Sequence, residues 1–163
     1  LGASYIIIGH SERRDSYQSE NLQIYEKVLR AVEKELTPII CIGESFEERQ
    51  NSETEAVLRN QLTSFLTNDL KNTNFVVAYE PKWAIGTGQV ASLPEIKKSH
   101  KFIREVISQS FNIEIARNIR IIYGGSVKPD NSTNILRLDE VDGALIGGAS
   151  LSPKDVLSII EGI

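Results

Sequence analysis

The stretch Phe75-Val76-Val77-Ala78-Tyr79-Glu80-Pro81 decides the fold class of this sequence. It opens with a continuous apolar run rather than an alternating one, which is typical of a strand buried on both faces of a parallel sheet. Similar short runs predict further strands at Tyr5–Ile8, Pro38–Ile42, Ile119–Tyr123 and Ala144–Ile146.

Segments with helical spacing separate these runs. Apolar residues at intervals of three and four predict helices over 22–32, 56–66, 96–107, 135–136 and 156–160. Ser92-Leu93-Pro94-Glu95 has the form of a capping box, and Ser152-Pro153 that of an N-cap followed by proline. His100 falls on the apolar side of its helix, so we interpret it as a packing residue.

The order of elements is therefore strand then helix, repeated five times, which implies right-handed crossovers and a parallel α/β sheet. An open doubly wound sheet and part of an eight-fold barrel both have this order. The glycines after the last two strands, Gly124-Gly125 and Gly147-Gly148, favour the barrel, because phosphate sites collect after strands seven and eight of such barrels.

Composition excludes several classes of protein. The 163 residues are 40% hydrophobic and 25% charged, the balance of a single soluble globular domain. The net charge of −4 argues against a nucleic-acid partner or an anionic membrane, since either favours a broad basic face. The apolar runs are far shorter than a bilayer span. The single cysteine, Cys41, permits no internal disulfide and is compatible with a reducing cytosol, and we expect a cytoplasmic protein.

The start of the sequence leads to a separate expectation. The chain has no methionine and begins Leu1-Gly2-Ala3-Ser4, directly before a predicted strand. We therefore expect residue 1 not to be the biological N-terminus. The alternative is a trimmed chain with nothing functional upstream.

Function should gather at the carboxyl ends of the parallel strands. Glu80 follows its strand with no intervening turn residue, so desolvation should raise its pKa and suit it to act as a general base. The alternative is a structural carboxylate paired with a nearby cation. His10 ends another strand just before a predicted helical turn, where the positive end of the helix dipole favours a neutral imidazole that can donate a hydrogen bond. A structural histidine is the alternative here.

Two further features suit a phosphate ligand. Gly124-Gly125-Ser126 and Gly147-Gly148 lack Cβ atoms at their glycines, so backbone N–H groups can approach an anion closely. The segment Ala84-Ile85-Gly86-Thr87-Gly88-Gln89 follows the candidate base and has stiffer flanks, as a closing lid needs. A turn and a flexible connector are the simpler interpretations.

Taken together, these residues resemble the triosephosphate isomerase family. The motifs match in order and spacing along the whole chain, in Ile8-Gly9-His10-Ser11-Glu12-Arg13-Arg14, Ala78-Tyr79-Glu80-Pro81, Trp83-Ala84-Ile85-Gly86-Thr87-Gly88, Tyr123-Gly124-Gly125-Ser126 and Asp142-Gly143-Ala144-Leu145-Ile146-Gly147-Gly148-Ala149. The resemblance implies a parallel (β/α)8 TIM barrel, of which this chain supplies about five βα units. It also implies the interconversion of dihydroxyacetone phosphate and glyceraldehyde 3-phosphate.

The resemblance also assigns roles to residues. Glu80 would be the base and His10 the neutral electrophile, a pair that is a known property of the family, with Glu12 as a supporting carboxylate. Backbone N–H groups would bind the phosphate at Gly86, Ser126, Gly147 and Gly148. The lid and its clamp would be formed by Trp83, Ile85, Tyr123 and Leu145. No metal and no organic cofactor is implied, and Cys41 is interpreted as a core residue.

The sequence departs from the family at Lys82, where many relatives have an aliphatic residue in the lid hinge. The family's Asn and active-site Lys after its first strand, and its dimer-forming loop after the third, have no counterpart in these residues. We therefore expect residues 1–163 to be the C-terminal part of one TIM-barrel domain, without its three N-terminal βα units. We expect these residues alone to have negligible activity, and the full-length protein to be a homodimer. The alternatives are a barrel that acts on a larger phosphosugar, and a non-catalytic partial barrel with a phosphate-binding or moonlighting surface.

Overall fold

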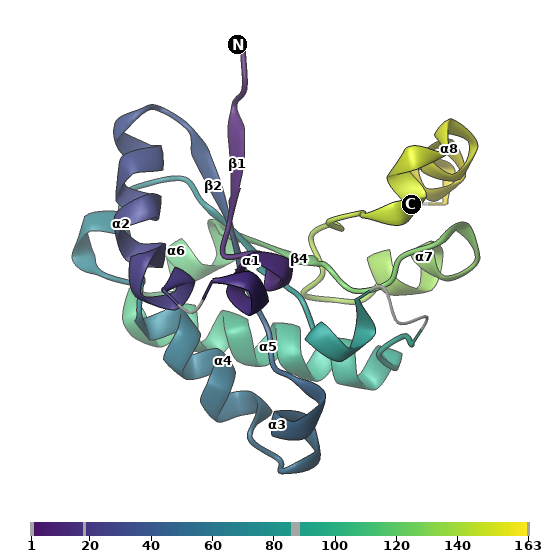
Figure 1. Ribbon diagram of the computed structural model, residues 1–163, viewed down its shortest axis with the longest axis horizontal. Coiled ribbons are helices and arrows are strands. Elements are labelled where there is room, and N and C mark those ends of the chain that lie inside the picture. Colours follow the sequence, from purple (N-terminus) through teal and green to yellow (C-terminus); the bar gives the residue numbers. More distant parts are fainter. Residues whose placement is uncertain (1, 18, 86–88, 163) are drawn as a thin grey trace.

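One parallel sheet organises the computed structural model, which describes residues 2–17, 19–85 and 89–162 (Figure 1). Its strands lie side by side in chain order, as β1 (Tyr5–Ile8), β2 (Thr37–Ile42), β3 (Val76–Tyr79) and β4 (Arg120–Tyr123). Val77 of β3 lies opposite Ile40 on one side and Ile121 on the other. Strands that follow one another in both sequence and space, all parallel, form a continuous arc of the kind that a βα barrel contains.

Helices connect successive strands, and the longer ones pack against the sheet. They are α1 (Ser11–Ser16), α2 (Glu20–Glu33), α3 (Phe46–Gln50), α4 (Thr54–Thr63), α5 (Leu93–Ser110), α6 (Ile113–Asn118), α7 (Pro129–Leu136) and α8 (Pro153–Glu161). Short 3₁₀ turns lie at η1 (Asn68–Leu70), η2 (Lys82–Ala84) and η3 (Gly148–Leu151).

The predicted helix starts are confirmed. Glu95 reaches back from α5 and accepts a hydrogen bond from the backbone N–H of Ser92 at 2.7 Å. The hydroxyl of Ser152 accepts one from the N–H of Asp155 at the start of α8, at 3.3 Å. Both contacts satisfy backbone groups that have no partner within the helix.

The core lies between β3 and the helices that pack on it. All of β3 is buried, and so are Leu58 and Leu62 of α4 and Ile96 and Ile103 of α5. His100 is completely buried on α5, which agrees with its interpretation as a packing residue. This packing fixes the carboxyl end of β3, where Glu80 follows.

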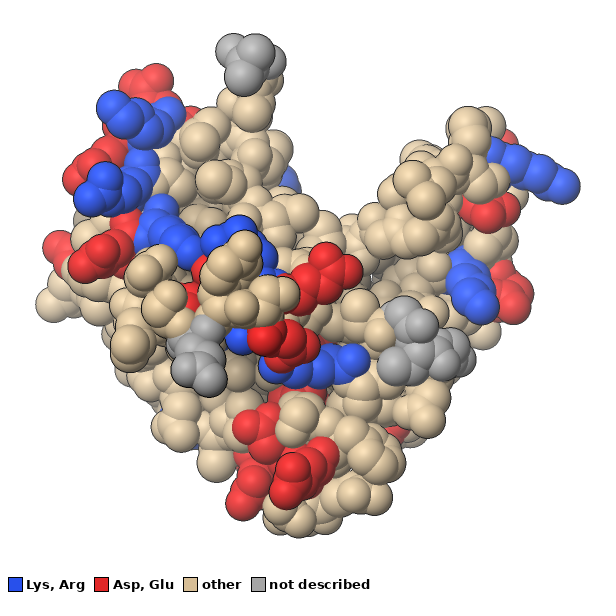
Figure 2. Space-filling view, viewed as in Figure 1, with Lys and Arg blue, Asp and Glu red and all other residues tan. Residues whose placement is uncertain are grey.

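The prediction of full burial is wrong for β1. Tyr5, Ile6 and Ile7 are exposed, because β1 lies at the edge of the sheet and pairs only with β2 among the described strands. The N-terminal end of β1 stands apart from α8, and the surface is hollowed between them (Figures 1 and 2). Apolar side chains are exposed on the far side of this notch as well, at Leu151, Leu157 and Ile160.

The predicted fifth strand is also wrong as a strand. Within Ala144–Ile146, the structure has a single parallel bridge between Ala144 and Tyr123. The segment is short and lies between Gly143 and Gly147, and its pairing with β4 does not extend beyond this bridge. Two short helices that periodicity did not predict, α3 and α6, fill the connections before α4 and β4.

Charged side chains are mixed over the visible surface rather than gathered into one basic area (Figure 2). Among the helices within the described ranges, none is both long and apolar enough to cross a membrane.

Candidate active site

Glu80 lies where β3 ends, in the interior of the molecule. Its backbone N–H continues the sheet by donating to the carbonyl of Ile42 at 2.7 Å, and only 2% of the residue is exposed. Burial raises the pKa of Glu80, while the neighbouring His10 and the N–H of Ser11 act in the opposite direction. The raised pKa agrees with the sequence-based prediction and suits a group that must take up a proton near neutral pH.

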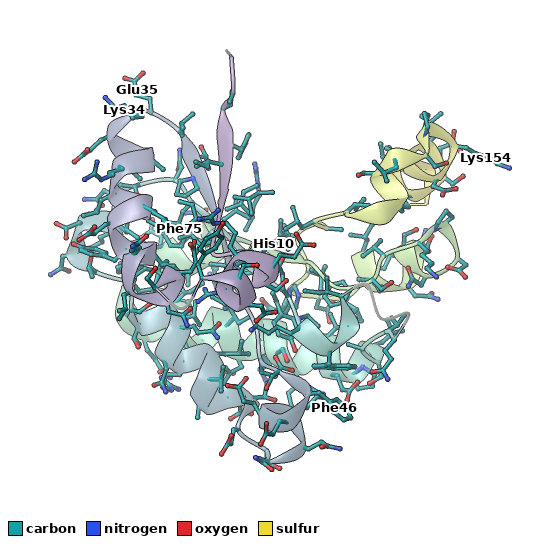
Figure 3. All side chains as sticks on the ribbon, viewed as in Figure 1. His10, Lys34, Glu35, Phe46, Phe75 and Lys154 are labelled. Atoms are coloured by element: carbon teal, nitrogen blue, oxygen red, sulfur yellow. The ribbon has the colours of Figure 1, made fainter. Side chains whose placement is uncertain are left out.

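His10 points its ring at the Glu80 carboxylate. Its Nε2 lies 3.2 Å from Glu80 Oε1, and its Nδ1 accepts a hydrogen bond from the N–H of Glu12 at 3.4 Å (Figure 3 labels His10). Because Nδ1 accepts, the proton of the neutral ring must be on Nε2, the nitrogen that faces Glu80. His10 is the N-cap of α1, so the helix terminus selects the tautomer.

The backbone at the start of α1 also contacts the base. The N–H of Ser11 donates to Glu80 Oε2 at 3.2 Å, so each carboxylate oxygen has its own partner. Sequence reasoning missed this contact, because it joins residues far apart along the chain. The side chain of Glu12, by contrast, is exposed, and within the described part of the chain no residue binds it. Its predicted supporting role has no contact in this structure.

Two glycines are required by the close approach of Glu80. A Cβ atom on Gly43 would lie 1.7 Å from the Glu80 carbonyl oxygen, and one on Gly124 would lie 2.7 Å from Glu80 Cγ. The side chain of Gln61 bonds both the N–H of Gly43, at 2.8 Å, and its carbonyl, at 3.1 Å. The residues after β2 and β4 therefore pack closely against Glu80 from both sides. The anion-binding interpretation of Gly124 did not include this close approach to Glu80.

The predicted phosphate ligands differ in their surroundings. Gly147 and Gly148 are exposed, with open space where a Cβ would stand, so an anion can reach their backbone. The N–H of Ser126 instead donates to the carbonyl of Ala84 at 3.1 Å. Gly86 lies outside the described residues.

The predicted lid and clamp residues are buried or half-buried. Trp83 lies in η2 and its indole N–H donates to Glu44 Oε1 at 3.1 Å, while Ile85 is half-buried. Tyr123 is buried, and desolvation raises its pKa to about 12 although the backbone of Ala91 acts in the opposite direction. Leu145 is half-buried, and its N–H donates to the Tyr123 carbonyl at 2.9 Å.

Two contacts at the site were not predicted. Lys82 Nζ lies 2.5 Å from Asp15 Oδ1, so the hinge residue that departs from the family pattern is joined to α1. The buried thiol of Cys41 contacts Glu80, and burial raises the pKa of this thiol. A thiol that is kept protonated agrees with the interpretation of Cys41 as a core residue.

The described residues offer no set of side chains that could bind a metal ion. Within 2–17, 19–85 and 89–162, no group of three or more His, Cys, Asp and Glu side chains could hold a metal ion. The chemistry that the described residues do offer is a proton acceptor, Glu80, and a hydrogen-bond donor, His10, at contact distance.

Comparison with known proteins shows the family to which the chain belongs. The family model for triosephosphate isomerase matches residues 1–163. The chain belongs to the triosephosphate isomerase family. It is 45% identical to the triosephosphate isomerase of Magnetococcus marinus, covering 100% of this chain and 66% of that protein. It is 42% identical to that of Chlamydia trachomatis serovar D, covering 100% and 60%.

A solved member of the triosephosphate isomerase family has the same fold. The crystal structure of the Bartonella henselae enzyme superposes with a TM-score of 0.90 at 40% identity, covering 99% of this chain and 65% of that one. The four-stranded parallel sheet is therefore an arc of a TIM barrel. The chain spans less than two thirds of the length of these relatives.

Proposed function

We propose that this chain carries the proton-transfer site of a triosephosphate isomerase, which interconverts dihydroxyacetone phosphate and D-glyceraldehyde 3-phosphate. The observation that carries the proposal is the contact of 3.2 Å between His10 Nε2 and the buried carboxylate of Glu80. Family membership favours this substrate pair over a larger phosphosugar.

The reaction uses these two groups in turn. Glu80 takes a proton from the carbon beside the substrate carbonyl, while His10 gives its Nε2 proton to the carbonyl oxygen, and an enediol forms. His10 then takes back a proton from the other hydroxyl group of the enediol, and the protonated Glu80 returns its proton to the former carbonyl carbon, so that the carbonyl and hydroxyl groups have exchanged places. A carboxyl with a raised pKa is suited to both steps, since it must gain and lose one proton in each cycle. A neutral imidazole stabilises the developing oxyanion without a net charge.

The exposed backbone of Gly147 and Gly148 supports a phosphate site after the segment Ala144–Ile146, to which Gly86 and Ser126 would contribute. The Ser126 N–H would have to leave the Ala84 carbonyl first, because it donates there in this structure. Ile85 and Leu145 would then exclude water from Glu80, with Tyr123 and Trp83 holding the lid.

We propose further that residues 1–163 correspond to the C-terminal portion of the family's barrel, strands four to eight. The exposed edge of β1 supports this correspondence, since it offers unpaired backbone groups to a preceding strand. The native polypeptide should then have a mass of about 27 kDa, from the roughly 250 residues of such barrels. A native mass near 18.2 kDa would contradict the proposal.

The proposed setting is glycolysis and gluconeogenesis in the cytoplasm, with the full-length protein as a homodimer. Residues 1–163 alone should have negligible activity. Their strands form only an open arc, and the remaining βα units of the barrel would be needed to complete the site. A coupled assay of triose phosphate isomerisation tests both statements, on the native polypeptide and on the isolated chain. A native polypeptide without turnover would refute the proposed function, and normal turnover of the isolated chain would refute its predicted inactivity.

A second candidate is a non-catalytic phosphate-binding partial barrel. The open notch beside β1 favours it, because a barrel interior that is exposed is available as a surface (Figure 2). Calorimetric binding of inorganic phosphate without turnover by the native polypeptide would support this alternative.

A further inference from the structure

A buried carboxylate supports the segment that carries Glu80. Glu44 follows β2 and is completely buried. Its Oε1 accepts hydrogen bonds from the Tyr79 hydroxyl and from the Trp83 indole, each at 3.1 Å. Its backbone carbonyl accepts the N–H of Lys82 at 3.0 Å. Glu44 therefore holds the residue before Glu80 and two residues shortly after it.

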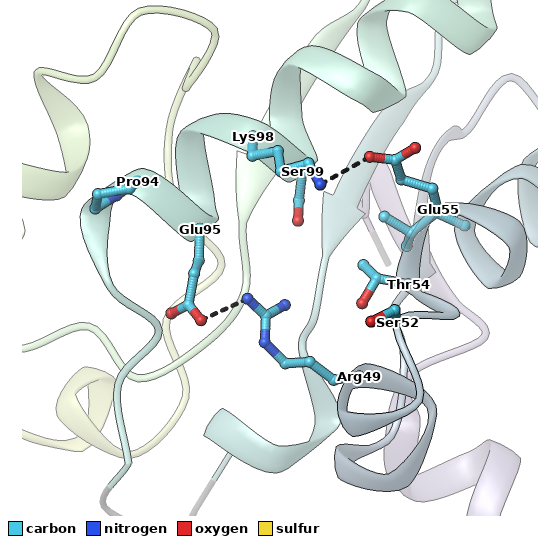
Figure 4. A pocket seen from close by; sticks show the side chains of 9 residues that line it. Arg49, Ser52, Thr54, Glu55, Pro94, Glu95, Lys98 and Ser99 are labelled. Atoms are coloured by element: carbon cyan, nitrogen blue, oxygen red, sulfur yellow. Dashed lines mark ion pairs between the residues drawn. The ribbon is translucent and has the colours of Figure 1, made fainter.

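Arg49 neutralises this carboxylate and links it to α5. Its Nη1 lies 3.0 Å from Glu44 Oε1, and its Nη2 lies 2.6 Å from Glu95 Oε1. The guanidinium also lies 5.0 Å from the centre of the Trp83 ring. Figure 4 shows Arg49 extending toward Glu95, with the ion pair drawn. A planar guanidinium can make all three contacts at once, which an ammonium group cannot.

We propose that Glu44 and Arg49 are positioning residues that fix the direction of the Glu80 carboxylate. This inference rests on the proposed function. The base must reach two neighbouring carbons from one place, and a displacement of about 1 Å at a reacting group costs on the order of 100-fold in rate. Several directional bonds converge on Glu44 Oε1, so the backbone on either side of Glu80 cannot shift without breaking them.

The surroundings of Arg49 provide a matched control. Arg49 and Glu95 line a cavity of about 480 Å³ between α4 and α5, whose rim also carries the ion pair of Lys98 and Glu55 at 3.0 Å (Figure 4). That pair is exposed on both sides, and neither residue contacts the segment around Glu80. Lys98→Met therefore removes a cation from the same cavity without touching the support.

The experiment compares Arg49→Met, Arg49→Lys and Lys98→Met in the native polypeptide. Arg49→Met leaves the Glu44 charge buried without its cation, which is strongly destabilising. The double variant Glu44→Gln with Arg49→Met removes both charges and serves if the single variant does not fold. The measurements are kcat and KM for the triose phosphates, together with hydrogen exchange of the Lys82 amide by NMR.

The expected result is a fall in kcat of roughly 10- to 100-fold for Arg49→Met, with KM changed much less, because chemistry rather than phosphate binding is affected. Protection of the Lys82 amide should fall about tenfold. Arg49→Lys should recover part of both losses, and Lys98→Met should match the wild type.

The inference is overturned if folded Arg49→Met or the double variant keeps the wild-type kcat and Lys82 protection. A wild type without turnover would instead refute the proposed function alone. Hydrogen exchange would still decide whether Arg49 holds the Glu80 segment, and unchanged protection would count against it.

Discussion

Acidification should charge His100, and this residue alone should cost the fold about 3 kcal/mol of stability between pH 7 and pH 4. His100 is completely buried on α5, with Nδ1 3.0 Å from the carbonyl of Glu140. Its Nε2 is buried and, among the described residues, has no hydrogen-bond partner. Desolvation lowers the pKa of His100 to about 4, against an ordinary value of about 6.5.

Whether acid stabilises or destabilises the fold depends on which state, folded or unfolded, binds the proton at the higher pH. The unfolded chain is protonated at His100 near pH 6.5, whereas the folded protein resists until about pH 4. The stabilisation is therefore complete above pH 6.5 and is lost as the pH falls through this window. About 2 kcal/mol should be lost by pH 5, where most carboxylates are still ionised. Nearby charges act in both directions, since Asp142 and Glu140 raise this pKa and Arg104 lowers it.

Urea unfolding of the native polypeptide at pH 7 and pH 5 measures this loss, with His100→Gln as the comparison. Glutamine can still donate to the Glu140 carbonyl but cannot titrate. The free energy of unfolding of the wild type should fall by about 2 kcal/mol more than that of the variant. Equal losses in the two proteins would show that His100 is not the group responsible, and the reasoning from its burial would be refuted.

Three further predictions concern the site. Glu80→Gln should lower kcat by roughly 10²- to 10⁴-fold, yet raise the urea midpoint at pH 7. The raised pKa means that the ionised carboxylate opposes folding above the ordinary Glu pKa, so the gain should vanish below about pH 4. Gly43→Ala should destabilise the protein by about 1–3 kcal/mol and lower kcat, because its Cβ meets the Glu80 carbonyl. Lys82→Leu should change stability by less than about 1 kcal/mol, since Asp15 is mostly exposed, and the change should shrink in high salt.

Each has an outcome that would contradict it. A Glu80→Gln variant that is less stable than the wild type at pH 7 would mean that partners outweigh desolvation. Wild-type kinetics in Gly43→Ala would mean that the backbone at Glu80 can move freely. A large, salt-independent loss in Lys82→Leu would mean that this ion pair is part of the core rather than a surface contact.

Periodicity predicted the elements whose patterns are local. Continuous apolar runs located β1 to β4, and spacings of three and four located α2, α4 and α5. The run at Ala144–Ile146 failed because this short segment makes only one bridge to β4, and a local apolar pattern does not record how far the pairing extends. The exposure of β1 has the same origin, since composition cannot distinguish an edge strand from a central one.

At the site, residue types and strand ends predicted Glu80 and His10, and the structure brings these two together. The residues that hold Glu80 could not be found in this way. Glu44 contacts Tyr79 and Trp83 across 35 and 39 residues of sequence, so only the folded chain joins them. The one available signal was the position of Glu44 two residues after the end of β2, since Glu80 follows the end of the neighbouring strand β3.

The contact between His10 and Glu80 has a consequence for the proposed reaction. The Nε2–H of His10 and the N–H of Ser11 give each oxygen of the Glu80 carboxylate a partner within the protein. We therefore expect a substrate carbonyl to compete with Glu80 for the His10 proton before the reaction can begin. Water and other anions would compete for the same proton of His10. They have no carbonyl oxygen that gains negative charge as the reaction proceeds. We therefore expect this hydrogen bond between His10 and Glu80 to favour ligands in which an oxygen atom gains negative charge during the reaction.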